Sequence, residues 1–146
     1  MSNIAVFGDI STNGIDGSSI WLQSICNVFA SEGHNVSLIL RDKPLLMSIT
    51  DGLYSKVKII NPWRQDYSEI SSENTISPEE LIILLTALNK VEVLDHIIMR
   101  APSVLQQLHR YTMKARNYDL INKVDAYFAR LNIFSDDYDL SVLSSA

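Results

Sequence analysis

The chain has 146 residues, of which 47% are hydrophobic and 20% charged, and its net charge at neutral pH is −5. This length and composition are typical of one globular domain with a substantial core, and they exclude a disordered polypeptide. The acidic balance and the lack of a basic run argue against nonspecific nucleic-acid binding.

The only cysteine is Cys26, which excludes an internal disulfide and a cysteine-based zinc site. We expect it to be a small core residue, and we expect no metal site. No stretch approaches the length of a membrane span. The first strand begins by residue 3 or 4, so we expect no signal peptide and a cytoplasmic protein.

Residues 3–40 predict a strand, a crossover helix and a parallel strand. Asn3–Gly8 and Val36–Leu40 are short apolar runs, and Asp9–Ser19 has the small polar residues of a loop. The helix, Ile20–Ser31, carries an apolar stripe that should face a core: Trp21, Leu22, Ile25, Val28 and Phe29. Because the loop follows the first strand, it should lie at the carboxyl edge of the sheet, where open α/β folds bind ligands.

This first loop contains the first set of candidate binding residues. Gly14 and Gly17 permit a close approach of the backbone to a ligand, although both also suit ordinary loop punctuation. Ser18 or Ser19 can cap the helix, whose free N–H groups could bind a phosphate or carboxylate. The Gly-x-Gly-x-x-Gly fingerprint is absent, which argues against a nicotinamide- or flavin-dependent enzyme, and we expect no cofactor.

The remainder of the chain alternates strand and helix signals. Ser77-Pro78-Glu79-Glu80 is a helix start with a capping box. Apolar spacing predicts the other elements: strands at Lys56–Ile60, Leu94–Arg100 and Tyr138–Ser144, a helix over 103–116, and a helical stripe formed by Leu120, Val124, Phe128 and Leu131. The sequence therefore predicts an α/β fold with an open, mostly parallel sheet and helices on both faces.

Two side chains after the fourth predicted strand extend the candidate site. Arg100 ends this strand beside the ligand edge, where its guanidinium could bind a phosphate or carboxylate or could pair with a nearby acid. Ser103 follows at the start of the next helix. Trp63 could hold a sugar or a lipid head group, but we favour a role in covering the sheet edge.

Three segments resemble the amino-terminal half of bacterial family-4 glycosyltransferases. They are Asn3-Ile-Ala-Val-Phe-Gly-Asp, Ile15-Asp-Gly-Ser-Ser-Ile-Trp-Leu and Glu32-Gly-His-Asn-Val-Ser-Leu-Ile-Leu. Asp95-His-Ile-Ile-Met-Arg-Ala-Pro also resembles a strand of that half which ends at the cleft. Such enzymes are retaining transferases of the GT-B fold, built from two Rossmann-like halves that face each other across a cleft.

The resemblance implies a nucleotide-sugar donor and a saccharide or lipid-linked acceptor, in cell-surface polysaccharide synthesis. Residues 1–146 would form the acceptor-side domain of a longer protein, with the loop around Gly17 against the donor diphosphate. The family often places a histidine after the strand that matches 94–100. Arg100 and Ser103 occupy that region here, and no catalytic residue is assigned.

The donor-binding carboxyl-terminal half would be missing, so we expect the isolated chain to be inactive. The resemblance is compatible with peripheral association of the full protein with the inner face of the membrane. In the isolated chain an apolar inter-domain face would be exposed and could form a homodimer. The alternative is a stand-alone Rossmann-like binding or interaction module without catalysis.

Overall fold

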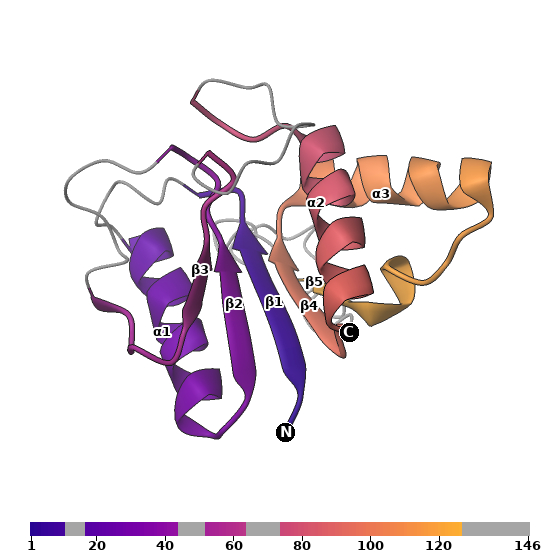
Figure 1. The fold of residues 1–146 in the computed structure, drawn as a ribbon. Coiled ribbons are helices and arrows are strands. Elements are labelled where there is room, and N and C mark those ends of the chain that lie inside the picture. Colours follow the sequence, from indigo (N-terminus) through magenta and orange to yellow (C-terminus); the bar gives the residue numbers. More distant parts are fainter. Residues whose placement is uncertain (11–16, 44–51, 64–73, 127–146) are drawn as a thin grey trace, which may run out of the picture.

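The structure is a computed structural model that describes residues 1–10, 17–43, 52–63 and 74–126 (Figure 1). Its centre is a five-stranded, all-parallel sheet with the strand order β3-β2-β1-β4-β5. The strands are β1 (Asn3–Gly8), β2 (Asn35–Ile39), β3 (Lys58–Ile60), β4 (His96–Arg100) and β5 (Val124–Ala126). The longer helices are α1 (Gly17–Ser31), α2 (Pro78–Val91) and α3 (Pro102–Ala115). The predicted α/β fold with a parallel sheet is confirmed.

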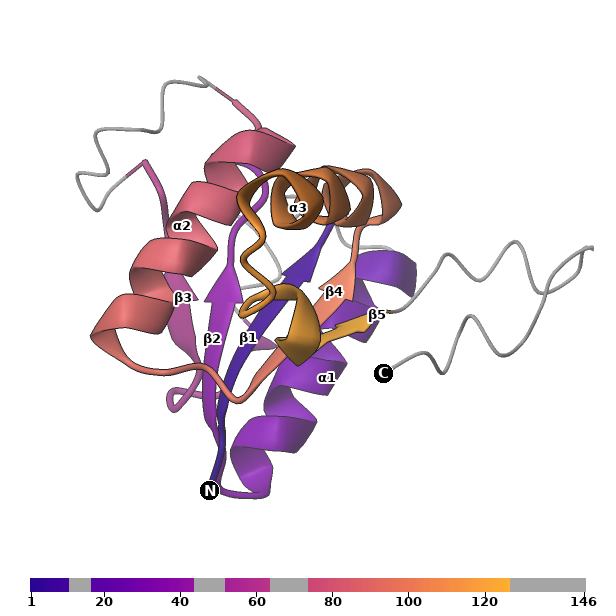
Figure 2. The ribbon, with the colours of Figure 1, turned by 90° about the vertical axis from the view of Figure 1, so that its right-hand side faces the viewer.

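Helices cover both faces of the sheet, with α1 on one side and α2 and α3 on the other (Figure 2). Neighbouring residues of a strand point to opposite faces, so the central strand β1 contributes to two cores. Ile4 and Val6 pack in the α1 core, whereas Ala5 and Phe7 pack in the core with α2 and α3. Right-handed crossovers explain this arrangement. The chain passes from β1 through α1 to β2 on one side of β1, and it returns from β3 through α2 to β4 on the other side.

Local signals placed α2 and α3 well, whereas α1 begins at Gly17, three residues earlier than predicted, so Ser18 and Ser19 lie inside the helix and not at its N-cap. Ser77 and Glu80 form the expected capping box of α2, with hydrogen bonds of 3.2 Å from Glu80 N to Ser77 Oγ and 2.9 Å from Ser77 N to Glu80 Oε1. Cys26 is a buried core residue of α1, as predicted. Val28, at the border of the expected apolar stripe, is instead 51% exposed, because the buried face of α1 is centred on Leu22, Cys26 and Ala30.

The predicted helical stripe over 120–131 is wrong where the structure describes it. Ile121–Lys123 is a short 3₁₀ turn, and Val124–Ala126 is β5, which pairs with β4 through Ile97↔Val124. The spacing of Leu120 and Val124 suits a helix, but the 3₁₀ turn separates them, and the hydrogen bonding of Val124–Ala126 to β4 makes this segment a strand. The predicted strand Tyr138–Ser144 lies outside the described residues.

Candidate functional site

The order of the strands reverses at β1 and β4, so the region beyond their carboxyl ends is the expected ligand position in this fold. Gly8 pairs with Arg100 in the parallel register, and the Asp9 N–H donates a 3.0 Å hydrogen bond to the Arg100 carbonyl. This bond extends the pairing beyond β1. The exits of the two strands are therefore held together, and the loops that follow both begin at one point.

Arg100 stands over the first turns of α1. Its guanidinium carbon lies 5.1 Å from the centre of the Trp21 ring, which is a cation–π distance. Trp21 is half-buried against the α1 core, so its packing fixes the ring on which Arg100 rests. Neither prediction for Arg100 named this contact. The structure thus joins the end of β4 to the start of α1, which are the two predicted parts of the ligand edge.

A second charged group ties the exits of β1 and β2 together. Asp9 Oδ1 lies 2.9 Å from Arg41 Nε, and Arg41 Nη1 lies 3.7 Å from Asp42 Oδ1. Thr75 Oγ1 donates a 3.2 Å hydrogen bond to the same Asp42 oxygen. Arg41 and Asp42, which follow the second strand in sequence, therefore connect the sheet edge to the segment that leads into α2.

The glycines and serines predicted to bind a ligand differ in their position and exposure. Gly14 lies outside the described residues, and Gly17 is the first residue of α1, followed by Ser18. The Ser19 side chain is fully buried. Ser103 is exposed in the first turn of α3, whose N-cap residue Ala101 makes no side-chain capping bond. The starts of both helices and the guanidinium of Arg100 belong to the same edge of the sheet.

Several groups lie away from this edge or are inert. Burial raises the pKa of the Cys26 thiol from 9.0 to about 12, so this thiol is protonated at neutral pH and is a poor nucleophile. His96 Nδ1 lies 3.4 Å from Asp125 Oδ2 at the amino-terminal end of β4. Trp63, which follows β3, packs against both hydrophobic cores, so its ring contributes to the packing of the fold.

Two absences hold for residues 1–10, 17–43, 52–63 and 74–126. These residues contain no cluster of three side chains suited to bind a metal ion. They also contain no helix with the length and apolarity that crossing a bilayer requires.

The ion pair of Asp9 with Arg41 is a second contact at this edge that the sequence did not predict, besides that of Arg100 with Trp21. Asp9 and Arg41 each follow a parallel strand closely, and carboxyl ends of parallel strands meet at one edge. Their opposite charges at matching positions were therefore a usable signal. The order of the strands was needed to show that these two exits are neighbours.

No family model and no curated protein matches this chain. Among solved structures, apo UGT2 from Phytolacca americana is similar, with a TM-score of 0.53 and 17% sequence identity. The match covers 88% of this chain and 29% of the UGT2 chain, so this chain spans under a third of the length of that protein. UGT2 is a UDP-glycosyltransferase with the GT-B fold. The similarity shows that the two chains share a Rossmann-like fold.

Proposed function

We propose that this chain is the acceptor-side domain of a sugar-nucleotide glycosyltransferase. The observation that carries the proposal is the match of 88% of this chain to 29% of the UGT2 chain, together with the strand reversal at β1 and β4. The resemblance of residues 3–40 and 94–102 to family-4 enzymes supports the finer version. In that version the enzyme is retaining and acts in cell-surface polysaccharide synthesis.

The chemistry of the carboxyl edge fits a supporting role. A departing nucleoside diphosphate needs positive charge or oriented N–H donors around its phosphates. Arg100 and the first turns of α1 and α3 can provide part of this, and Gly17, Ser18 and Ser103 are the sequence-predicted candidates in these two turns. We infer that the remaining phosphate ligands come from a second domain, and that residues 1–146 alone do not transfer sugar.

The first experiment measures the polypeptide that carries this sequence in its source cell. An antibody raised against the chain should detect a protein of about 300–400 residues, the size of two ordinary domains. The protein captured by this antibody should release nucleoside diphosphate from at least one of UDP-glucose, UDP-N-acetylglucosamine and GDP-mannose when a saccharide acceptor is added. The purified 146-residue chain is the negative control.

Transfer by the 146-residue chain alone would contradict the acceptor-side assignment. A captured protein of 16.5 kDa that acts on none of the donors would contradict the transferase proposal as a whole. That outcome would favour the stand-alone binding module. The mutual pairing of Asp9 and Arg41 at the carboxyl edge is the observation that agrees with such a module.

A further inference from the structure

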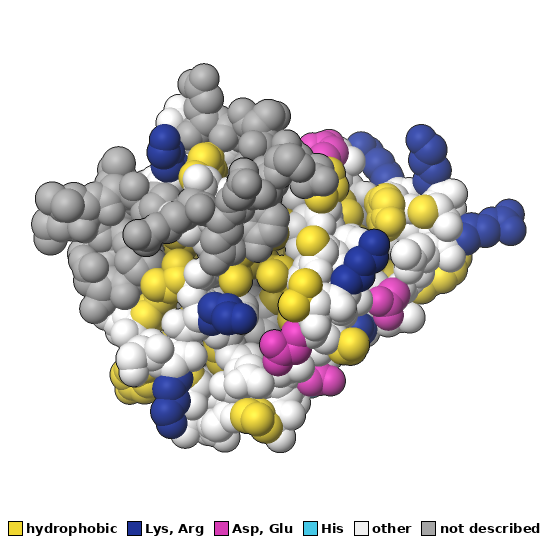
Figure 3. Space-filling view, in the orientation of Figure 1, with side chains coloured by type: hydrophobic (Ala, Val, Ile, Leu, Met, Phe, Trp, Pro, Cys, Tyr) yellow, Lys and Arg dark blue, Asp and Glu magenta, His cyan; other side chains and the backbone are white. Residues whose placement is uncertain are grey.

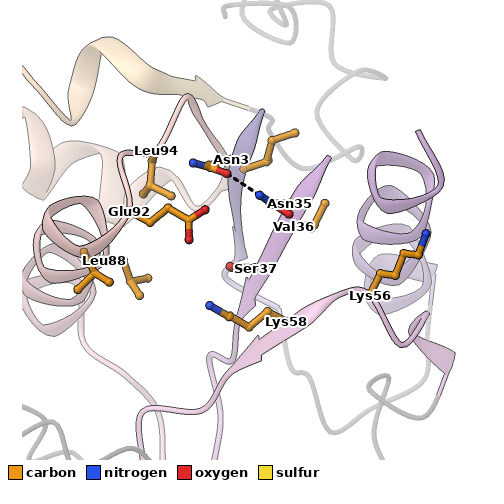
Figure 4. A pocket seen from close by; sticks show the side chains of 11 residues that line it. Asn3, Asn35, Val36, Ser37, Lys56, Lys58, Leu88, Glu92 and Leu94 are labelled. Carbon is orange, nitrogen blue, oxygen red and sulfur yellow. Dashed lines mark hydrogen bonds between the residues drawn. The ribbon is translucent and has the colours of Figure 1, made fainter. Parts of the chain in front are cut away.

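A pocket of about 210 Å³ opens at the opposite, amino-terminal edge of the sheet. It lies between the sheet face of β1, β2 and β3 and the last turn of α2 (Figure 4). Drug-sized ligands and nucleotides occupy pockets of about 300–1,000 Å³, so this one suits a smaller molecule. Its position over the amino-terminal residues of these strands separates it from the proposed donor edge at their carboxyl ends.

The sheet face that forms this pocket is unusually polar. Strands of a parallel sheet covered by helices are normally continuous apolar runs. Here Asn35, Ser37 and Lys58 occupy the positions of β2 and β3 whose side chains point toward the α2 side, and Ser37 pairs with Lys58 in the register. Further along the same two strands, Ile39 and Ile60 are buried in the α2 core. The polar residues therefore coincide with the part of the sheet that α2 leaves open.

Opposite charges converge on the pocket from two elements. Figure 4 shows Lys58 from β3 and Glu92 from the end of α2 extending into the same space, whereas Lys56 points away. Neither Lys58 nor Glu92 forms an ion pair within the part of the chain that the structure describes. Basic and acidic side chains also lie close together on the lower half of this face in the space-filling view (Figure 3).

The other side chains that line the pocket include apolar leucines and polar groups from β2. Leu94 is 6% exposed and forms a buried wall, beside half-buried Leu88. Asn35 Nδ2 donates to Asn3 Oδ1 at 2.9 Å, which holds the Asn35 amide in place. The Ser37 hydroxyl has no hydrogen-bond partner among the described residues.

From this arrangement we propose that the pocket binds a free α-amino acid with an aliphatic side chain. The ligand carboxylate pairs with Lys58 and accepts from Ser37, and its ammonium group pairs with Glu92. The aliphatic side chain packs against Leu88 and Leu94. The pocket volume of about 210 Å³ is below the range of drug-sized sites and suits a small ligand such as leucine. This site does not depend on the glycosyltransferase proposal.

The test is a titration of the ¹⁵N-labelled 146-residue chain with leucine, followed by amide chemical shifts. We expect a dissociation constant of the order of 1 mM, given the few atoms of such a ligand, with the largest shifts at Asn35, Ser37 and Lys58. N-acetyl-leucine lacks the ammonium group and leucinamide lacks the carboxylate. Each should bind at least about tenfold more weakly, because it leaves one charged partner unmatched.

Variants localise the interaction. Lys58→Met and Glu92→Gln should each weaken leucine binding about tenfold. Lys90→Met and Glu79→Gln make the same changes at exposed positions of α2 that do not line the pocket. These control variants should keep the dissociation constant for leucine within twofold of the parent value. The proposal is overturned if leucine produces no shifts at 20 mM, if both analogues bind as tightly as leucine, or if the control variants weaken binding as much as the pocket variants.

Discussion

The carboxylate of Asp9 lies 2.9 Å from Nε of Arg41, and this ion pair joins the exits of two neighbouring parallel strands. The Asp9 side chain is 45% exposed and that of Arg41 28% exposed, so water screens their attraction. The pair therefore orients the start of the first loop more than it stabilises the fold. The edge proposed to face a nucleotide sugar begins at this contact.

A double-mutant cycle measures this pair. Asp9→Asn, Arg41→Met and the double variant should give a coupling energy of about 0.3–1 kcal/mol in urea unfolding at low salt. Arg41→Met should cost more than Asp9→Asn, because Arg41 also lies 3.7 Å from Asp42. The coupling should shrink in ~1 M salt, where screening is strong. A coupling that is zero at low salt would contradict the ion pair.

The contact of Arg100 with Trp21 gives a second prediction. Arg100→Met should lower the free energy of unfolding by about 0.5–1 kcal/mol through loss of the cation–π contact, and Arg100→Lys should lower it less. In a Trp63→Phe background the remaining fluorescence reports Trp21, and its emission should change in Arg100→Met. Unchanged emission together with unchanged stability would show that Arg100 does not rest on this ring.

The two serines near helix starts provide a matched pair. Ser77→Ala removes the N-cap of α2 and should cost about 1 kcal/mol, within a range of about 0.5–2. Ser103→Ala removes an exposed hydroxyl at the start of α3 and should change stability by less than about 0.5 kcal/mol. Urea unfolding of both variants checks this. A cost of less than about 0.5 kcal/mol for Ser77→Ala would contradict its role as a cap.

Because the Cys26 thiol is buried, we expect the folded chain to lose stability at high pH. The pKa of its thiol is about 12 in the folded chain against 9.0 when exposed, so the unfolded chain releases this proton first. The buried protonated thiol therefore contributes fully to the free energy of unfolding below pH 9. This contribution is lost as the pH rises toward 12, by about 1.4 kcal/mol per pH unit.

Cys26→Ala provides the comparison for this effect. The variant is expected to be less stable than the parent at pH 7 because it leaves a small cavity, and the difference should narrow between pH 9 and 11. A parallel measurement uses a thiol reagent, which should modify Cys26 only after unfolding in urea. Rapid modification of the native chain, or a difference that stays constant with pH, would contradict the burial of the thiol.

The fold was predictable where local chemistry and periodicity agree. Asn3–Gly8 is the predicted first strand at both ends, and Ser77 begins α2 through the capping box that its sequence shows. The fifth strand was misassigned because Leu120 and Val124 have a helical spacing although they belong to different elements, Leu120 preceding the 3₁₀ turn and Val124 beginning β5. Only the pairing with β4 identifies the second of these elements as a strand.

The candidate site was predictable as a place but not as a set of contacts. Arg100 was expected at the ligand edge because it ends a parallel strand, and it does lie there. Its stacking on Trp21 depends on how α1 packs over β1 and β4, which no local signal encodes. The pocket around Lys58 and Glu92 escaped prediction for the same reason, since it exists only where α2 stops short of the sheet edge.

The pairing of β1 with β4 has a consequence for synthesis on the ribosome. Asn3 N donates to Asp95 Oδ2 at 2.7 Å across 92 residues of sequence, and the two strands then stay in register to Gly8 and Arg100. A nascent chain can pair β1 with β2 early, but the other edge of β1 has no partner until about 100 residues have emerged. During that interval the central strand is an open edge that other chains could join. We expect this domain to complete its sheet late in translation and to benefit from chaperones that shield β1.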